Sequence, residues 1–196
     1  MYDYIKGDLI ELTPTEIVLD CNGIGFKILI SLQTYSDLKQ GEKAKLYIHH
    51  HVREDTELLF GFSNKDERFM FRNLIDVSGI GPNSARMMLS SLTSDEIRNA
   101  IITGDVNKLK SIKGIGLKTA QRLLIELKDK IAKGSSADIS ASLYPLSDNS
   151  RKEEAASALV LLGFTKANVE KVLDLLIREN PSYSLEELIK HSLKKL

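Results

Sequence analysis

The chain has 196 residues, 42% of them hydrophobic, and its 27 basic residues are balanced by 27 acidic ones. This length and composition are typical of a folded globular protein and exclude a disordered chain. No apolar run approaches the roughly 20 residues of a membrane span, and the N-terminus does not resemble a signal peptide, so a cytosolic protein without membrane contact is expected. The single Cys21 excludes an internal disulfide.

The charges are unevenly distributed along the chain. Residues 1–64 carry 6 basic and 10 acidic side chains, residues 65–133 carry 13 and 8, and residues 134–196 carry 8 and 9. An acidic, a basic and a nearly neutral block indicate three units with different partners. Only the middle block has the sign expected for contact with phosphate.

The first block contains short runs that are β-branched or alternating and are separated by Pro, Gly, Asn or acidic residues. Five short strands with one small helical insert predict a closed barrel, for which an oligonucleotide-binding (OB) fold is the natural candidate. An SH3-like barrel is the alternative, because strand counting alone does not separate the two. The predicted strands are Asp8–Thr13, Thr15–Cys21, Gly25–Ser31, Ala44–His51 and Thr56–Phe62, and the helix lies near Thr34–Lys39.

The hydrophobic period changes to that of helices at Asn64, beginning with Lys65–Ile75. The serine-rich segment 134–150 has no amphipathic period and predicts a flexible linker. Three short helices follow over 151–162, 166–178 and 184–195, the last opened by a Ser184–Glu187 capping box. The expected fold class is a multidomain α+β protein with a barrel over 1–64, an all-α domain over 65–133, the linker over 134–150 and a three-helix bundle over 151–196.

One string occurs twice in the basic block. Val77–Ala85 reads VSGIGPNSA and Ile112–Ala120 reads IKGIGLKTA, so the Gly-Ile-Gly triplet, a hydroxyl residue and an alanine recur at an offset of 35 residues. A single copy is equally well explained as a plain turn between helices. Two copies in register predict a tandem of helix-hairpin-helix motifs.

The repeated string has the chemistry of a phosphate site. Its glycines permit φ > 0 and keep side chains away from the backbone, its isoleucine is expected to anchor the hairpin in the core, and Pro82 suits the first residue of a helix. A helix that starts at such a hairpin points free N–H groups and its positive dipole end outward, toward a DNA phosphate. Contacts of this kind are independent of base sequence. The predicted DNA-binding residues are Gly79, Ile80, Gly81, Asn83, Ser84, Gly114, Ile115, Gly116, Lys118 and Thr119.

Two other kinds of site are excluded by spacing. Gly114–Thr119 is not a nucleotide-binding P-loop, because Leu117 separates Lys118 from the last glycine and no strand precedes the string. The His49–His51 run is not a zinc site, because neighbours on a strand alternate faces and only two of the three can converge. We expect no metal and no cofactor.

The order of these features resembles the RuvA family, the Holliday-junction-recognition subunits of the bacterial branch-migration complex. The resemblance covers the whole chain, and its most specific strings are GFSNKDER (Gly61–Arg68), GIGPNSA and GIGLKTA. It implies a homotetramer that binds a four-way DNA junction, with a second tetramer on the other face as an option. It also implies that the RuvB ATPase is recruited through the C-terminal bundle, and that the RuvC nuclease is a further partner at the junction.

The resemblance gives meaning to two further groups of residues. Glu54 and Asp55, in the turn after the fourth strand, match the acidic pin that stands at the junction centre. Leu162, Gly163 and Phe164 resemble the first turn of a ubiquitin-associated-type bundle and are candidates for partner binding. Asn83 and Leu117 stand where many relatives carry Lys. The competing functions are a helix-hairpin-helix glycosylase or nuclease and a protein-interaction adaptor.

Overall fold

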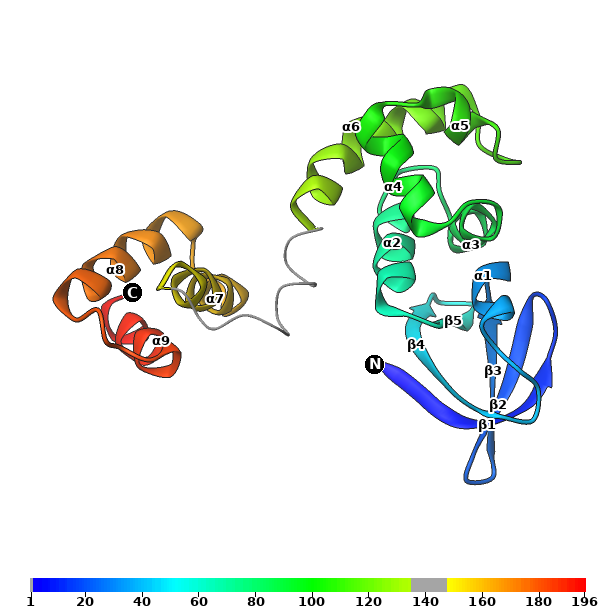
Figure 1. Ribbon diagram of the computed structural model, residues 1–196, viewed down its shortest axis with the longest axis horizontal. Helices are drawn as coiled ribbons and strands as arrows, with labels where there is room; N and C mark the ends of the chain where they lie inside the picture. Colours follow the sequence, from blue (N-terminus) through cyan, green and yellow to red (C-terminus); the bar gives the residue numbers. More distant parts are fainter. Residues whose placement is uncertain (1, 135–147) are drawn as a thin grey trace. The chain divides into compact units, whose positions relative to one another are not determined.

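The computed structural model describes residues 2–134 and 148–196, which belong to two compact units, Met1–Asp138 and Ile139–Leu196 (Figure 1). Most of the predicted linker lies outside the described residues, and the helix after it begins at Asp148, inside the segment expected to be linker. In the described residues, no helix combines the length and the apolar character that a membrane crossing requires.

The N-terminal part of the first unit is a closed five-stranded barrel with the strand order β1-β2-β3-β5-β4. All neighbouring strands are antiparallel except β3 and β5, which pair in parallel at Leu29↔Phe60 and Ile30↔Gly61. This order, with helix α1 between β3 and β4, confirms the OB-like barrel and removes the SH3-like alternative. The strands are β1 Tyr4–Leu12, β2 Glu16–Cys21, β3 Ile24–Ile30, β4 Lys43–Val52 and β5 Glu57–Phe62, and α1 is Leu32–Ser36.

The start of β1 and the bounds of α1 differ from the prediction by more than one residue. Strand β1 begins at Tyr4, before the predicted Asp8, because its first residues pair with β4 from Tyr4↔Tyr47 to Asp8↔Lys43. Helix α1 begins at Leu32 because the hydroxyl of Ser31 accepts a hydrogen bond from the Thr34 N–H and caps it. The alternation of hydrophobic residues predicts neither which strand pairs with the start of β1 nor which residue caps α1.

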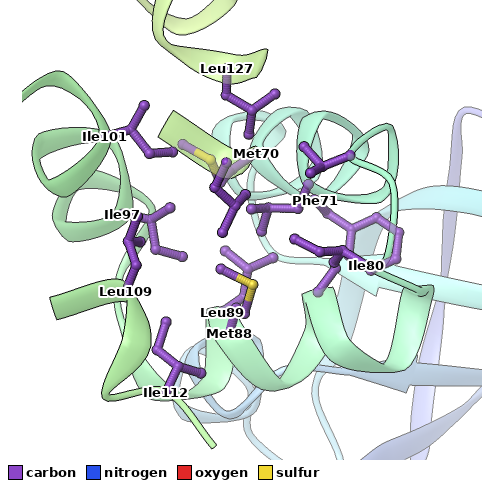
Figure 2. Packing of buried hydrophobic residues seen from close by; sticks show 14 of the residues in the cluster. Met70, Phe71, Ile80, Met88, Leu89, Ile97, Ile101, Leu109, Ile112 and Leu127 are labelled. Carbon is purple, nitrogen blue, oxygen red and sulfur yellow. The ribbon is translucent and has the colours of Figure 1, made fainter. Parts of the chain in front are cut away.

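Five helices follow in the same unit. Helix α2 occupies Lys65–Ile75, as predicted, and its N-cap Asn64 accepts from the Glu67 N–H. The others are α3 Pro82–Ser91, α4 Ser94–Thr103, α5 Val106–Lys110 and α6 Leu117–Gly134. Their apolar faces meet in one cluster (Figure 2). The cluster also contains Phe60 and Phe62 of β5, so the barrel and the helices share a core.

A buried carboxylate and a guanidinium strengthen this junction between barrel and helices. The Glu67 carboxylate on α2 accepts hydrogen bonds from the hydroxyls of Ser31 and Thr34, the latter at 2.7 Å. Arg68 donates to the carboxylate and the carbonyl of Asp3, both at 2.7 Å. Because these partners lie on different elements, α2 is held in one orientation on the barrel.

The second unit is a three-helix bundle formed by α7 Asp148–Leu161, α8 Lys166–Glu179 and α9 Leu185–Lys195. Its small core contains the buried residues Ala155, Leu159, Val169, Leu173, Leu176 and Leu188. Helix α9 is preceded by the predicted capping box, in which the Ser184 hydroxyl accepts from Glu187 N–H and the Glu187 carboxylate accepts from Ser184 N–H. The predicted multidomain α+β class is confirmed.

Candidate nucleic-acid interface

The first repeated string forms a tight hairpin between α2 and α3, here called hairpin 1 (residues 76–81). The chain leaves α2 at the C-cap Asp76 and enters α3 at Pro82, with Gly81 as N-cap. Gly79 has φ = +92°. A Cβ added there would meet nothing within 4 Å, so the tip of the hairpin is open to solvent.

The second string forms hairpin 2 (residues 111–116) between α5 and α6 with the same internal bonding. The N–H of Ile80 donates to the Val77 carbonyl at 3.0 Å, and 35 residues later Ile115 donates to Ile112 at 3.0 Å. Gly114 has φ = +90°, almost the value of Gly79. The sequence repeat is therefore a repeat of backbone structure.

The two isoleucines of the triplets are buried in the core. Ile80 is 4% exposed and Ile115 is 6% exposed, and Figure 2 shows Ile80 pointing into the cluster beside Phe71. Their N–H groups are also committed inside the hairpins. The prediction that these isoleucines anchor the hairpins in the core is confirmed. Since both side chains are buried and both N–H groups are bonded, the neighbouring glycines are the exposed part of each triplet.

The second glycine of each triplet differs from the first. Gly81 has φ = −85° and ψ = 169°, an extended conformation that any residue adopts. Gly116 also lies outside the positive-φ region, and a Cβ at either position would meet nothing within 4 Å. Of the four glycines, Gly79 and Gly114 adopt the positive φ that glycine permits, and Gly81 and Gly116 do not. Within the protein, neither backbone conformation nor a close contact requires glycine at these two positions.

Both hairpins lead directly into helix N-termini that can receive an anion. The first bonds within the helices are Ala85 N–H to the Gly81 carbonyl at 3.0 Å and Ala120 N–H to the Gly116 carbonyl at 2.9 Å. The N–H groups between these residues have no acceptor in their own helix and point along its positive end. Ala85 and Ala120 are fully buried, which allows each helix to pack closely beneath its hairpin.

The side chains around the two hairpins differ in charge. After hairpin 1, α3 offers the exposed Asn83 and the partly buried Ser84, and after hairpin 2, α6 offers the exposed Lys118 and the partly buried Thr119. Lys113 is exposed within hairpin 2 itself. Lys113 was not among the predicted DNA-binding residues. Its position inside the repeated string, between Ile112 and Gly114, would have been sufficient reason to include it.

Arg122, a basic residue that the sequence analysis did not single out, connects the two hairpins. The Arg122 guanidinium on α6 donates to the Ser78 carbonyl at 3.4 Å and to the Ser78 hydroxyl at 3.3 Å. Because Ser78 lies in hairpin 1 and Arg122 follows hairpin 2, this contact fixes the two helix N-termini relative to each other.

The acidic turn lies beside hairpin 1. Glu54 and Asp55 are exposed at the tip of the β4–β5 hairpin, which is closed by a 2.8 Å hydrogen bond from Arg53 N–H to the Thr56 carbonyl. A hollow of about 300 Å³ separates this turn from the start of α3. Its lining includes Arg53, Asp55, Gly81, Pro82, Asn83 and Ser84. A carboxylate and an anion-receptive helix end thus face the same open space.

The histidine run on β4 packs against aromatic side chains. His49 and His51 lie on one face, as alternation requires, with ring centroids 6.1 Å apart. The His49 ring lies 5.2 Å from that of Phe71, and this burial lowers the pKa of His49 to about 4. Among residues 2–134 and 148–196, no cluster of three His, Cys, Asp or Glu side chains has the arrangement of a metal site.

Two of the three C-terminal residues expected to bind a partner, Gly163 and Phe164, have a structural role within the bundle. Gly163 has φ = +102°, and the Phe164 N–H donates to the Leu159 carbonyl, which together form a Schellman end to α7. Phe164 packs on the bundle core. Leu162 remains 61% exposed and its neighbour Leu161 is 87% exposed, so the outward apolar surface here is formed by the two leucines.

Comparison with known proteins gives matches to three family models along the chain. Residues 1–61 match the RuvA N terminal domain, residues 71–129 match the SAM-like helix-hairpin-helix tandem, and residues 150–196 match the RuvA C-terminal domain. The chain is 46% identical to the Holliday junction branch migration complex subunit RuvA of Bacteroides fragilis and 46% identical to that of Christiangramia forsetii. It is 40% identical to that of Porphyromonas gingivalis, and each of these three alignments covers 100% of both chains. With a relative of this identity over its full length, the chain belongs to the RuvA family.

Proposed function

We propose that this protein binds four-way (Holliday) junction DNA, independently of base sequence, and serves as the non-catalytic subunit of a branch-migration complex in recombination and repair. The observation that carries the proposal is the doubled hairpin, in which two exposed glycine tips with φ near +90° precede helix N-termini at an offset of 35 residues. The names of the full-length relatives support the same function.

Each hairpin is proposed to hold one phosphate group of the DNA backbone. The first-turn N–H groups of α3 and α6 donate to phosphate oxygens, and the helix dipole favours the negative charge there. Bare Gly81 and Gly116 allow the phosphate to approach, while Asn83, Ser84, Lys118 and Thr119 add side-chain contacts. Because phosphates carry no base information, affinity is independent of sequence.

The acidic turn is proposed to give the preference for a junction. A continuous duplex that lies across the hollow beside hairpin 1 brings phosphates close to Asp55, which lines the hollow, and to its neighbour Glu54, and like charges repel. At the centre of an open junction the strands diverge, so the same carboxylates occupy the space between them. In a homotetramer, four such turns meet at the crossing point and guide the separated strands outward.

The C-terminal bundle is proposed to recruit the motor. Its apolar surface around Leu161 and Leu162 has the character of a docking site, and the RuvB ATPase is the partner that the family resemblance implies. The ATPase activity of the complex then belongs to another chain. The RuvC nuclease and a second tetramer on the opposite face of the junction are further proposed partners.

A mobility-shift comparison tests the proposal. A four-way junction, a linear duplex and a single strand of the same base composition are titrated with the full chain, and the junction is repeated with a second, unrelated sequence. We expect the tightest binding to both junctions with equal affinity. Equal affinity for linear duplex and junction would contradict junction recognition, and strand cleavage or base release by the purified protein would support a helix-hairpin-helix repair enzyme instead.

A further inference from the structure

One outer face of the barrel is basic although the barrel as a whole is acidic. On β1 and β4 the pleat turns Ile5, Ala44 and Leu46 inward, where all three are buried. The alternate residues face outward and pair across the strands as Tyr4↔Tyr47, Lys6↔Lys45 and Asp8↔Lys43. With Lys65 at the start of α2, the Lys–Tyr face defined here consists of Tyr4, Lys6, Lys43, Lys45, Tyr47 and Lys65.

The lysines of this face lack carboxylate partners. Elsewhere in the same unit lysines form ion pairs, such as Lys27 with Glu16 at 3.0 Å and Lys108 with Glu96 at 3.4 Å. Within residues 2–134 and 148–196, none of the four lysines of the Lys–Tyr face has a carboxylate oxygen within 4 Å. Asp8 is the one acidic residue in the paired rows. Asp20, on the neighbouring strand, lines the same pocket as Lys6, Asp8 and Lys43, so the excess positive charge of the face is concentrated at Lys45 and Lys65.

A neighbouring ion pair leaves this excess unchanged. Asp3 is held by Arg68 at 2.7 Å, and the hydrogen bond from Arg68 lowers the pKa of the Asp3 carboxyl. That pair is neutral in sum. A cluster of unpaired lysines on a strand face costs electrostatic free energy unless an anion is bound there.

Two tyrosines are placed among these charges. The Lys45 ammonium lies 4.2 Å from the centroid of the Tyr4 ring and 5.0 Å from that of Tyr47. The Lys65 ammonium lies 5.8 Å from the Tyr47 centroid. Tyr4 is 52% exposed, so a large part of its ring is open to a ligand. Charged groups interleaved with exposed aromatic rings form the usual surface for an unpaired nucleic-acid strand, whose phosphates pair with Lys and whose bases stack on Tyr.

We propose that the Lys–Tyr face is a second nucleic-acid site and that it binds single-stranded DNA. The lysines contact the phosphates, and the ring of Tyr4 stacks with a base. This site differs in kind from the hairpins, which offer backbone N–H groups to phosphates and have no aromatic ring in the repeated strings. An acidic protein surface would satisfy the lysines but leaves the exposed ring unexplained, so single-stranded DNA is the better fit.

Fluorescence anisotropy with a labelled oligothymidylate of about 15 nucleotides tests the site, a length near the upper site size of one OB fold. The variants are Lys45→Glu and Tyr4→Leu in the full chain. Lys39→Glu is the matched control, because Lys39 is exposed on the same barrel after α1 and makes the same change of charge. The protein contains no Trp, so quenching of its tyrosine emission gives a second measure of stacking.

We expect Lys45→Glu to weaken oligothymidylate binding by at least about tenfold at low salt and to reduce the salt slope by about 0.7 for each phosphate that is no longer neutralised. Tyr4→Leu weakens it by roughly 5- to 100-fold, the range for removal of one base stack, and abolishes part of the quenching. Lys39→Glu has a smaller effect, and junction affinity through the hairpins changes little in Tyr4→Leu. The two proposals are therefore tested separately. Junction binding by the hairpin variants tests the proposed function, and oligothymidylate binding by the Lys45 and Tyr4 variants tests this site.

Two results would overturn the inference. One is equal oligothymidylate affinity in Lys45→Glu, Lys39→Glu and the unaltered chain. The other is a change in molar mass, measured by light scattering, in Lys45→Glu without any change in oligothymidylate affinity, which would assign the face to contact between copies of the chain. Circular dichroism melting of each variant checks that the barrel is folded, and Lys45→Gln repeats the test if the charge reversal alone is unstable.

Discussion

The difference in backbone conformation between Gly114 and Gly116 allows stability and DNA binding to be separated within one hairpin. Both positions open to solvent, and a methyl group would meet nothing within 4 Å at either one. Only Gly114 has a positive φ, at +90°. We therefore compare Gly114→Ala with Gly116→Ala, which add the same atom to the same hairpin.

For Gly114→Ala the alanine is strained, and such a conformation costs of order 1–3 kcal/mol. With an unfolding entropy of about 2.1 cal/mol/K per residue, a loss of about 1–3 kcal/mol in a unit of this size lowers Tm by about 3–10 °C. For Gly116→Ala no strain arises, and the restriction of the unfolded chain leaves the free energy of unfolding unchanged or raises it by about 0.4–1 kcal/mol. Differential scanning calorimetry measures both.

For DNA, both variants lose affinity, because each methyl group intrudes where the phosphate approaches the first turn of α6. Losing one hydrogen bond to a charged group costs about 1.5–3 kcal/mol, or roughly 10- to 100-fold in Kd. Junction titrations below the Tm of both variants measure this. Hairpin 1 gives an internal replicate through Gly79→Ala and Gly81→Ala, since Gly79 has φ = +92° and Gly81 has φ = −85°. Full junction affinity in a stable Gly116→Ala protein would show that the tip of hairpin 2 is a turn and not a phosphate site.

Three further expectations concern the pin, the bundle and the histidines. Replacing Glu54 and Asp55 with Gln and Asn relieves repulsion and should tighten duplex binding several-fold while reducing the preference for a junction; unchanged affinities for both DNAs would make these residues plain turn formers. Deleting residues 148–196 should leave junction affinity within about twofold but abolish branch migration driven by added RuvB, and a folded truncated protein that no longer binds junctions would contradict the modular account. Because the pKa of His49 is about 4 when folded and 6.5 when unfolded, the unfolded state takes up more protons in this range, so stability should fall as pH drops from 6.5 toward 4. In His49→Gln this loss of stability should be smaller by about 1 kcal/mol, a figure that discounts the solvent-exposed part of the ring. Thermal melts at several pH values measure it, and identical pH profiles of the variant and the unaltered chain would refute the assignment to His49.

The sequence alone determined the features that depend on residues a few positions apart. Alternation of apolar residues located the strands, the Ser184–Glu187 capping box marked the start of α9, and the repeat at an offset of 35 identified the two hairpins. These patterns can be recognised in the sequence because the period of a strand, the period of a helix and the capping of a helix each depend on residues a few positions apart. The resemblance of the same strings to the RuvA family added the expected function.

Only the tertiary structure decided the features that depend on distant partners. The early start of β1 follows from its pairing with β4, and the contact between Arg122 and Ser78 joins residues 44 positions apart. The hollow that brings Asp55 to the start of α3 exists because Phe60 and Phe62 of the barrel enter the helical core, which fixes the β4–β5 turn beside hairpin 1. No local period encodes such pairings, since they arise from which apolar faces bury one another and are settled by the packing of the whole unit.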